Sequence, residues 1–166
     1  MMRTLLFLGV LWLTLGGCGY KPASHYTQEV LSDRIFADVQ IPRDDPRGAG
    51  IMGDALREAV VARFGGRLVS REEADTHLYI TNATQRITAL QRDEQGFVIL
   101  YRSSVTLTTR VNTPTVRNRI VETSGIYDFA VSPDSVLSES ERTGASRQAA
   151  SRALDELLAR LVLMGR

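Results

Sequence analysis

The sequence has few of the residues that build covalent or metal-based frameworks. Cys18 is the only cysteine among 166 residues, so no internal disulfide and no cysteine-based zinc or iron–sulfur site can form. The two histidines, His25 and His77, are far apart in the sequence, and neither lies in a metal-ligand motif. We therefore expect no metal and no cofactor.

The sequence also lacks an excess of charge of either sign. It has 20 basic and 19 acidic side chains. The opening segment 1–17 resembles a targeting segment and contains one of the basic ones, Arg3, so its removal leaves equal numbers of basic and acidic side chains. Generic nucleic-acid binding needs a net positive field that neutralises phosphates. We therefore expect no nucleic-acid partner.

Signatures of catalysis are missing as well. The sequence contains no Gly-x-Ser-x-Gly elbow and no Gly-rich phosphate loop with its lysine. The acidic residues Glu72, Glu73 and Asp75 have no partner cluster and are typical of a solvated turn. Because no nucleophile, base and oxyanion site form a coherent set, we predict that the protein is not an enzyme. The alternative is an envelope hydrolase with a scattered active site that includes His77 and nearby acids.

The segment 1–17 is typical of a signal peptide. Arg3 supplies a positive charge, residues 4–15 are almost wholly apolar, and Gly16 and Gly17 form a small-residue end. The apolar run is shorter than the roughly 20 residues that a membrane-spanning helix needs. Residues 15–18, Leu-Gly-Gly-Cys, resemble the bacterial lipobox, in which the cysteine carries a diacylglyceryl group. We predict cleavage before Cys18 and lipid attachment to it; a plain secretory signal and a short uncleaved anchor are the alternatives.

The residue after the lipidated cysteine indicates the destination. Gly19 stands where an aspartate often signals retention in the inner membrane, so resemblance to this sorting rule predicts the outer membrane, at its periplasmic face. Stable anchoring takes more than one acyl chain, and the triacylated end of a lipoprotein satisfies that need. Residues 18–33 are polar and weakly patterned, and we interpret them as a lipidated tether before a single domain at 34–166.

Hydrophobic periodicity predicts the elements of this domain. Alternation indicates a strand over 34–41, and helical spacing of apolar residues indicates a helix over 51–64 that stops at Gly65 and Gly66. Residues 67–70 are interpreted as a short strand, and 76–91, 97–111 and 117–131 as three longer ones. Ser138 and Glu141 have the spacing of a capping box, which predicts a helix that runs from there to the end of the chain.

The order is therefore β-α-β-β-β-α, which predicts an α+β fold with two helices packed on one face of a four-stranded, mostly antiparallel sheet. Leu78 and Ile80 share one parity and Ile87 and Ala89 the other, so we expect a bulge or bend between residues 82 and 86. Gly125, within a strand pattern, indicates a bulge or a close backbone contact.

Arginines on the long strands are the candidate binding residues. Guanidinium groups suit bidentate contacts with phosphate or carboxylate, and Arg117 and Arg119 project to the same face if that segment is extended. A solvated sheet face with cross-strand ion pairs is the alternative for each of them. The arginines on the strands or at their ends are Arg86, Arg92, Arg102, Arg110, Arg117 and Arg119.

Several segments resemble one family of bacterial lipoproteins. The opening Cys-Gly-Tyr-Lys-Pro at 18–22 is similar to the start of the LPS-assembly lipoproteins of the LptE family. The early strand and the helix after it, the Ala-Asp pair at 74–75, the hairpin at 91–101 and the stretch 123–129 also resemble that family, especially its divergent Campylobacter-type members. The resemblance spans nearly the whole chain after residue 17, although none of these motifs is a catalytic signature.

The resemblance implies a non-catalytic lipoprotein that sits inside the β-barrel of LptD, plugs it, assists its assembly and binds lipopolysaccharide during transport to the cell surface. Family members are proposed to use basic residues against lipid A phosphates, but the resemblance assigns these to no position here. Charge and strand placement favour Arg86, Arg92, Arg117 and Arg119 as the lipopolysaccharide contacts. The alternative partner is an ABC-type envelope lipid transporter with this chain as its auxiliary lipoprotein.

Overall fold

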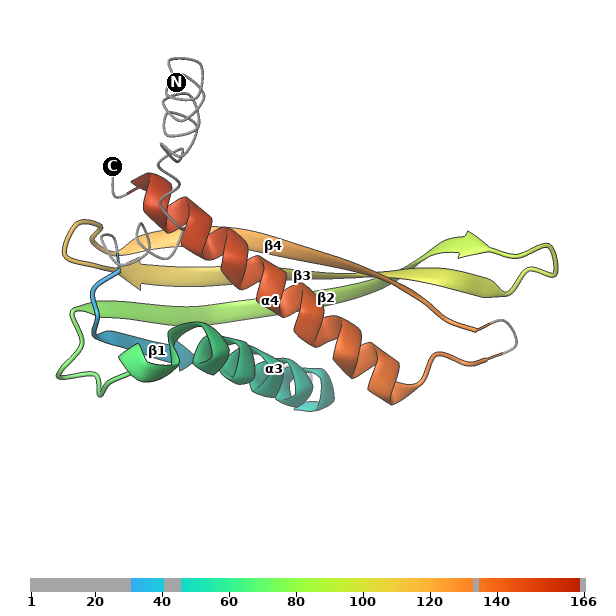
Figure 1. Ribbon diagram of the computed structural model, residues 1–166, viewed down its shortest axis with the longest axis horizontal. Coiled ribbons are helices and arrows are strands. Elements are labelled where there is room, and N and C mark those ends of the chain that lie inside the picture. The colour runs from blue at the N-terminus through green and yellow to red at the C-terminus, as the bar shows by residue number, and fades with distance from the viewer. Residues whose placement is uncertain (1–30, 41–45, 133–134, 165–166) are drawn as a thin grey trace, which may run out of the picture.

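The computed structural model describes residues 31–40, 46–132 and 135–164 (Figure 1). They form strands and helices in the predicted order β-α-β-β-β-α. The elements are β1 (Ile35–Val39), α3 (Pro46–Phe64), the short 3₁₀ helix η1 (Gly65–Arg67), β2 (Thr76–Arg92), β3 (Val98–Asn112), β4 (Arg119–Ala130) and α4 (Glu139–Met164).

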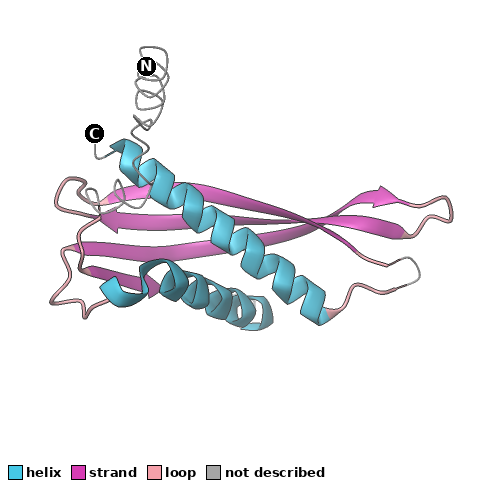
Figure 2. Ribbon diagram, viewed as in Figure 1, coloured by secondary structure: helices cyan, strands magenta, loops and turns pink. Residues whose placement is uncertain are grey.

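A single sheet carries the strands in the order β1-β2-β3-β4. β1 is parallel to β2, whereas the β2–β3 and β3–β4 pairs are antiparallel. Both helices lie on the same face of the sheet (Figure 2), with α4 diagonally across β3 and β4 and α3 near β1. The predicted α+β arrangement of two helices on one face of a mostly antiparallel sheet is therefore confirmed.

The hydrophobic core lies between the sheet and the helices. β3 directs alternate residues toward the helices, and Val105, Leu107 and Val111 among them are fully buried. Both helices contribute a stripe of buried side chains, and removing this apolar surface from water is the main favourable term in folding. The helical members of the core are Met52, Leu56, Val60, Phe64, Ala149, Ala150, Ala153, Leu154, Leu157 and Leu161.

β2 contains the expected bulge, one residue earlier than predicted. The register with β3 shifts between Ile80 and Asn82, so Thr81 is the inserted residue. Its hydroxyl donates a hydrogen bond to the Thr108 carbonyl oxygen at 3.2 Å. The change of parity requires an insertion between Ile80 and Ile87 but does not fix its place, which is why the predicted range of 82–86 was wrong.

Two local features differ from the sequence prediction. Residues 67–70 do not form a strand: η1 occupies the first of them, and Leu68 makes one isolated parallel bridge to Ile35. The first helix begins at Pro46 instead of residue 51, because proline fits the first position of a helix, where its missing N–H needs no partner. The predicted end of the first strand, at Ile41 and Pro42, lies outside the described residues.

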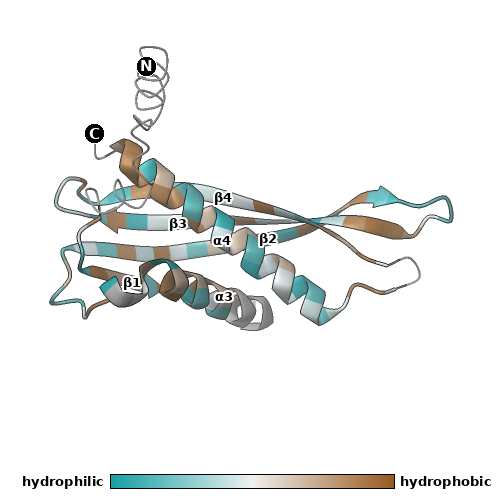
Figure 3. Ribbon diagram, viewed as in Figure 1, coloured by the Kyte–Doolittle hydropathy of each residue, from teal (hydrophilic) through white to brown (hydrophobic). Residues whose placement is uncertain are grey.

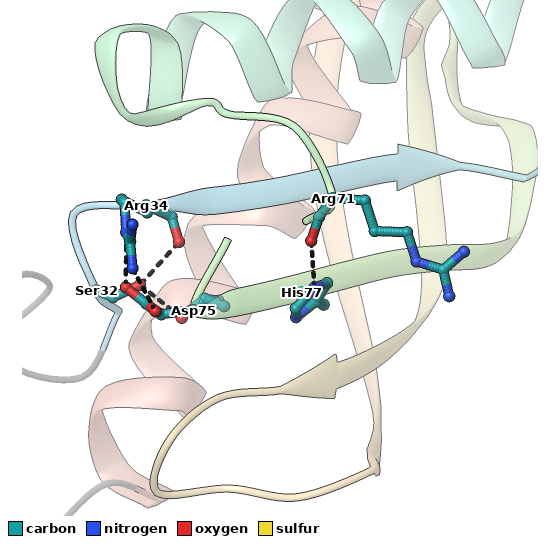
Figure 4. Close-up of polar contacts among 6 residues, drawn as sticks. Ser32, Arg34, Arg71, Asp75 and His77 are labelled. Carbon is teal, nitrogen blue, oxygen red and sulfur yellow. Dashed lines mark hydrogen bonds and ion pairs between the residues drawn. The ribbon is translucent and has the colours of Figure 1, made fainter. Parts of the chain in front are cut away.

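The folded domain includes residues that the sequence assigns to the tether. Leu31 is fully buried in the core. The Ser32 hydroxyl donates to the Arg34 carbonyl oxygen at 2.8 Å and contacts the Thr76 hydroxyl at 3.2 Å (Figure 4). Packing therefore begins before the predicted domain boundary at residue 34.

Gly125 lies where α4 crosses β4. A Cβ atom at this position would be 1.9 Å from the Ala149 carbonyl oxygen and 2.4 Å from the Ala153 amide nitrogen. The β3–β4 register continues through Gly125 without a shift. Of the two predicted roles, the structure selects the close backbone contact, which only glycine permits here.

The β2–β3 hairpin projects beyond both helices (Figure 1). In this part of the sheet neither α3 nor α4 covers a face, and apolar residues run along the projecting end of β3 (Figure 3). Leu90 and Phe97 are 42% and 48% exposed. In the part of the chain that the structure describes, neither helix combines the length and apolarity needed to cross a membrane.

Candidate functional site

The candidate arginines are spread along the sheet. Arg86 is opposite Ser104 on β3, Arg92 is opposite Val98, and Arg119 is opposite Val111. At about 3.3 Å per residue of β3, Arg119 therefore lies about 23 Å from Arg86 and about 43 Å from Arg92 along the strand direction. The predicted residues do not meet in one site: Arg86 is also about 20 Å from Arg92, and only Arg117 and Arg119 are close together.

Arg92 stabilises the tip of the β2–β3 hairpin through a hydrogen bond. Its Nη1 donates to the Gly96 carbonyl oxygen at 2.8 Å. Asp93 Oδ1 accepts from the amides of Gln95 at 3.1 Å and Phe97 at 2.8 Å. Gly96 has a φ of 90°, which glycine adopts without steric cost. The tip is therefore a structured turn that holds an exposed guanidinium group in place.

Arg86 lies on the face of the sheet that the helices leave uncovered, beyond the bulge that follows the β1 pairing. The Ser104 hydroxyl donates to its carbonyl oxygen at 3.3 Å. Its side chain is exposed and forms no ion pair with the described residues. This guanidinium is free to meet a carboxylate or a phosphate from another molecule.

Arg117 and Arg119 do not project from one extended strand. Arg117 lies in the β3–β4 connection, and Asn118 has a φ of 47° before β4 begins at Arg119. The premise of an extended segment was therefore wrong. The connection is held by Thr113, whose amide donates to the Val116 carbonyl oxygen at 2.7 Å and whose Oγ1 accepts the Val116 amide at 2.9 Å.

Arg119 instead lines a groove between β4 and the end of α4. The groove has a volume of about 340 Å³ and is lined by Arg119, Ile120, Val121, Glu122, Arg160, Leu163 and Met164. Ile120 and Leu163 are 67% and 70% exposed. Arg160 binds Glu156 at 2.6 Å, so it is already paired. The second arginine of the groove, Arg119, has no ion pair among the described residues. Its guanidinium and the apolar walls together suit an amphipathic anion.

The sequence prediction missed the helical half of this groove. Arg160 and Leu163 flank the buried stripe of α4, where exposed side chains are usual and carry no signal. Only the crossing of α4 over β4 brings them beside Arg119. A helical stripe identifies the buried face of a helix but not the strand on which its end rests.

Aromatic side chains form a second surface near the start of α4. Tyr101 and Phe129 have ring centroids 5.8 Å apart, and Tyr127 and Phe129 are 6.3 Å apart. The Arg152 guanidinium lies 5.2 Å from the centre of the Tyr127 ring, a cation–π contact. A groove of about 300 Å³ lies beside them, lined by Tyr127, Phe129, Ala130, Glu141, Gly144, Ala145 and Gln148.

One of the other strand arginines is paired across the sheet. Arg102 makes a bidentate contact with Asp128, from Nε to Oδ1 at 2.7 Å and from Nη2 to Oδ2 at 2.8 Å. The hydrogen bonds from Arg102 hold the pKa of the Asp128 carboxyl below its usual value. Arg102 therefore follows the alternative interpretation of a solvated sheet face with cross-strand ion pairs.

The acidic turn and His77 stabilise the local structure (Figure 4). Arg34 binds Asp75 through Nε at 3.1 Å and Nη2 at 2.9 Å, and these hydrogen bonds lower the pKa of Asp75. His77 Nε2 lies 3.1 Å from the Arg71 carbonyl oxygen. Across residues 31–40, 46–132 and 135–164, no group of three or more His, Cys, Asp or Glu side chains is arranged to hold a metal ion.

The predicted lipid-attachment residue, Cys18, and the first histidine, His25, lie outside the described residues. Their predicted roles as an acylated amino terminus and a tether residue therefore stay predictions. The described chain starts at Leu31, beyond both of them.

Solved structures with the same fold include two lipoproteins. A putative lipoprotein from Caulobacter crescentus matches with a TM-score of 0.53 and 12% identity, over 84% of this chain and 93% of that chain. A minor lipoprotein from Acinetobacter baumannii matches with a TM-score of 0.50 and 12% identity, over 80% of this chain and 93% of that one. At these identities the likeness shows the fold alone.

Sequence comparison identifies the family. No match is found among curated proteins. A family model described as "Lipopolysaccharide-assembly" matches residues 36–161, which includes all of the sheet except Ile35 and nearly all of both helices. This chain therefore belongs to the LptE family of lipopolysaccharide-assembly proteins.

Proposed function

We propose that this protein is an outer-membrane lipoprotein, acylated on Cys18 at the periplasmic face, that plugs an LptD-like β-barrel, assists its assembly and binds lipopolysaccharide during transport to the cell surface. The family match over residues 36–161 carries this proposal, because it assigns the chain a role in lipopolysaccharide assembly. The barrel partner, the lipid anchor and the bound lipopolysaccharide are proposals that go beyond the family match.

The uncovered face of the sheet supports the role of a plug. It carries hydroxyl side chains on the central strands, including Thr84, Ser104, Thr106 and Thr108. The interior of an outer-membrane barrel is polar, so hydroxyl groups and ion pairs such as Arg102–Asp128 are compatible with it. A face of this kind can lie against a polar barrel wall if its unpaired charges, such as Arg86, meet groups of opposite charge there.

Two arginine-bearing surfaces support lipopolysaccharide binding. The hairpin presents Arg92 near the exposed side chains of Leu90 and Phe97, with Arg86 further along β2, and the groove at the other end joins Arg119 to Ile120 and Leu163. Lipid A combines phosphates with acyl chains, and a guanidinium beside exposed aliphatic groups matches both. This chemistry needs no catalytic group, and we propose that the protein is not an enzyme.

The direct test is purification of the full-length protein from detergent-solubilised envelopes of its native host, with identification of bound proteins by mass spectrometry. We expect an LptD-like barrel in stoichiometric amount. Recovery of a free monomer after mild extraction would contradict the proposal. Recovery with an ABC transporter instead would support the role of an auxiliary lipoprotein in lipid transport.

The anchor is tested on the same material. Mass spectrometry of the amino-terminal peptide should show Cys18 as the first residue, carrying three acyl chains. Separation of inner and outer membranes should place the protein in the outer-membrane fraction. An unmodified thiol with the protein in the cytosol would exclude both the anchor and the location.

A further inference from the structure

β2 is paired along its whole length on one edge but only at its start on the other. β1 pairs with β2 from Thr76 to Ile80, and the Gln40 amide adds one hydrogen bond to the Ile80 carbonyl oxygen at 2.8 Å. β2 then continues beyond Ile80 as far as Arg92. Among the described residues only β3 pairs with this part of β2, so its other edge is open.

Backbone alternation shows which groups face the open edge. The Ile80 carbonyl points toward β1. The Val131 amide donates to the Ile99 carbonyl oxygen, so odd-numbered residues of β3 bond toward β4 and even-numbered ones toward β2. Even-numbered residues of β2 over 82–88 are opposite even-numbered residues of β3 and bond to them. The odd-numbered residues, whose N–H and C=O groups face the open edge, are Ala83, Gln85, Ile87 and Ala89.

The other edge of the sheet, formed by β4, is partly covered by α4. On β4, the Ser124 amide donates to Glu156 Oε2 at 2.6 Å, and Arg152 donates to the Ile126 carbonyl oxygen. Both partners are on α4, which approaches β4 closely at Gly125. Proteins usually cover, shorten or charge exposed edges because an open one is a template for pairing with another chain. The fold covers the middle of the β4 edge, whereas no described strand pairs with the edge of β2 after Ile80.

The charges on β2 indicate what pairs with this edge. Over 81–92 the only charged residues are Arg86 and Arg92, and there is no proline. A second copy, paired two-fold and antiparallel about the middle of this stretch, would place the Arg86 side chains of both copies on one face as close neighbours, and like charges there are unfavourable. An extended segment with an acidic residue beside Arg86 has the complementary charge.

We propose that the open edge of β2, from Ala83 to Ala89, receives an extended segment of the barrel protein as an additional strand of the sheet. Main-chain hydrogen bonds to the outward-facing residues supply the affinity, and a carboxylate beside Arg86 supplies the register. This inference rests on the proposed function, because the barrel is the partner that it assumes.

Proline substitution tests the main-chain contact. In Ile87→Pro the ring removes an N–H that faces the open edge, a position where edge strands tolerate proline. In Ile87→Ala the side chain shrinks but the N–H remains. With the full-length protein expressed together with its barrel, we expect Ile87→Pro to reduce co-purified barrel about tenfold or more. Ile87→Ala should retain more than half of the parental amount.

Thermal unfolding of each free variant shows whether it folds. A folded Ile87→Pro variant that co-purifies as much barrel as the parent would overturn the inference, and so would equal losses in Ile87→Pro and Ile87→Ala. Charge is tested by Arg86→Glu, which should reduce co-purification, whereas Arg57→Glu on α3 should not.

Amide hydrogen exchange gives a readout that needs no variant. Peptides that cover residues 81–92 should exchange more slowly in the complex with the barrel than in the free protein, with the slowing at residues 83, 85, 87 and 89. A complex that forms without slowing at these amides would overturn this inference and leave the proposed function standing. If no complex with a barrel forms under any extraction, both fail.

Discussion

At the scale of single residues, the arginines differ in what they already bind. Arg34, Arg63 and Arg102 each hold a carboxylate through two nitrogens. In the part of the chain that the structure describes, the candidate ligand-binding arginines form no ion pair: these are Arg86, Arg92, Arg117 and Arg119. A phosphate can reach their exposed guanidinium groups without breaking any ion pair in the described part of the chain.

Replacing these arginines should weaken lipopolysaccharide binding. The double variant Arg117→Ala/Arg119→Ala removes two charged donors near the groove at the end of α4, and we expect its affinity to fall about tenfold or more, since each hydrogen bond to a charged group contributes about 1.5–3 kcal/mol. Titration of purified lipopolysaccharide into the fluorescently labelled protein measures this. Arg57→Ala on α3 is the control, and an equal loss there would point to nonspecific charge effects.

Gly125 is the residue on which the approach of α4 to the sheet depends. In Gly125→Ala the new methyl group meets backbone atoms of α4 at less than 3 Å, and backbone atoms cannot move aside as a side-chain end can. We expect the free energy of unfolding to fall by about 3 kcal/mol. Urea denaturation of the variant and the parent measures the difference.

Gly144→Ala is the matched control for this substitution. A Cβ atom at Gly144 meets nothing within 4 Å, and Gly144 lies inside α4. Alanine in a helix interior is more stable than glycine by about 0.5–1 kcal/mol. A loss of stability at Gly144, or none at Gly125, would contradict this account of the packing.

At the scale of elements, α4 is the helix that the sequence described best. Its capping box forms as predicted: the Ser138 amide donates to Glu141 Oε2 at 2.8 Å, and the Glu141 amide donates to Ser138 Oγ at 3.3 Å. The helix then extends for 26 residues along the predicted apolar stripe. Residues close together in the sequence determine both the start and the buried face of this helix, so both could be predicted from the sequence.

Removing the cap should destabilise α4 from its start. In Ser138→Ala the amide of Glu141 loses its acceptor, and the expected loss of stability is about 1 kcal/mol. Chemical denaturation measures it, and the circular dichroism of the folded variant should match that of the parent. The Ser140 hydroxyl contacts Ser138 Oγ at 3.1 Å but takes no part in the reciprocal pair of hydrogen bonds, so Ser140→Ala should change stability by less than half as much.

The sequence predicted the features that local patterns determine and missed those that depend on contacts between distant segments. The alternation on β3 and the stripe on α4 predicted the layers, because each element must bury its apolar face. The exact position of the bulge at Thr81, the isolated bridge at Leu68 and the burial of Leu31 depend on neighbouring strands, so no local pattern specifies them. The groove at Arg119 was missed because it joins a strand and a helix that are distant in the sequence.

At the scale of the whole molecule, carboxylates distributed over the surface couple stability to pH. Asp75 and Asp128 are hydrogen-bonded by arginines, Glu141 by Ser138, and Glu156 by the Ser124 amide, and each of these contacts lowers the pKa of the carboxyl group. A lowered pKa in the folded state means that the stabilisation is complete above the ordinary carboxyl pKa of about 4. It is lost as the pH falls through the folded-state values.

We therefore expect the free energy of unfolding to be nearly constant from pH 7 to about pH 5 and to decrease below that. Asp128→Asn should make the decrease shallower, because one of the coupled carboxyl groups is gone while the side chain keeps its size. Urea denaturation at a series of pH values measures both curves. A stability that stays level down to about pH 3 would contradict the assigned contacts.

The alignment of the strands gives the molecule two structurally different poles. Ile35 pairs with Thr76, His77 with Asn112, and Arg119 with Val111, so the domain's first strand, the β3–β4 connection and the end of α4 gather at one pole. The hairpin tip is the other pole, about 50 Å away along the 15 residues of β3. An anchor on the segment before Leu31 would hold the first pole near the bilayer, and the hairpin tip would then extend away from the anchored end. Its reach would be set by the length of β3 and by the spacer between Cys18 and Leu31.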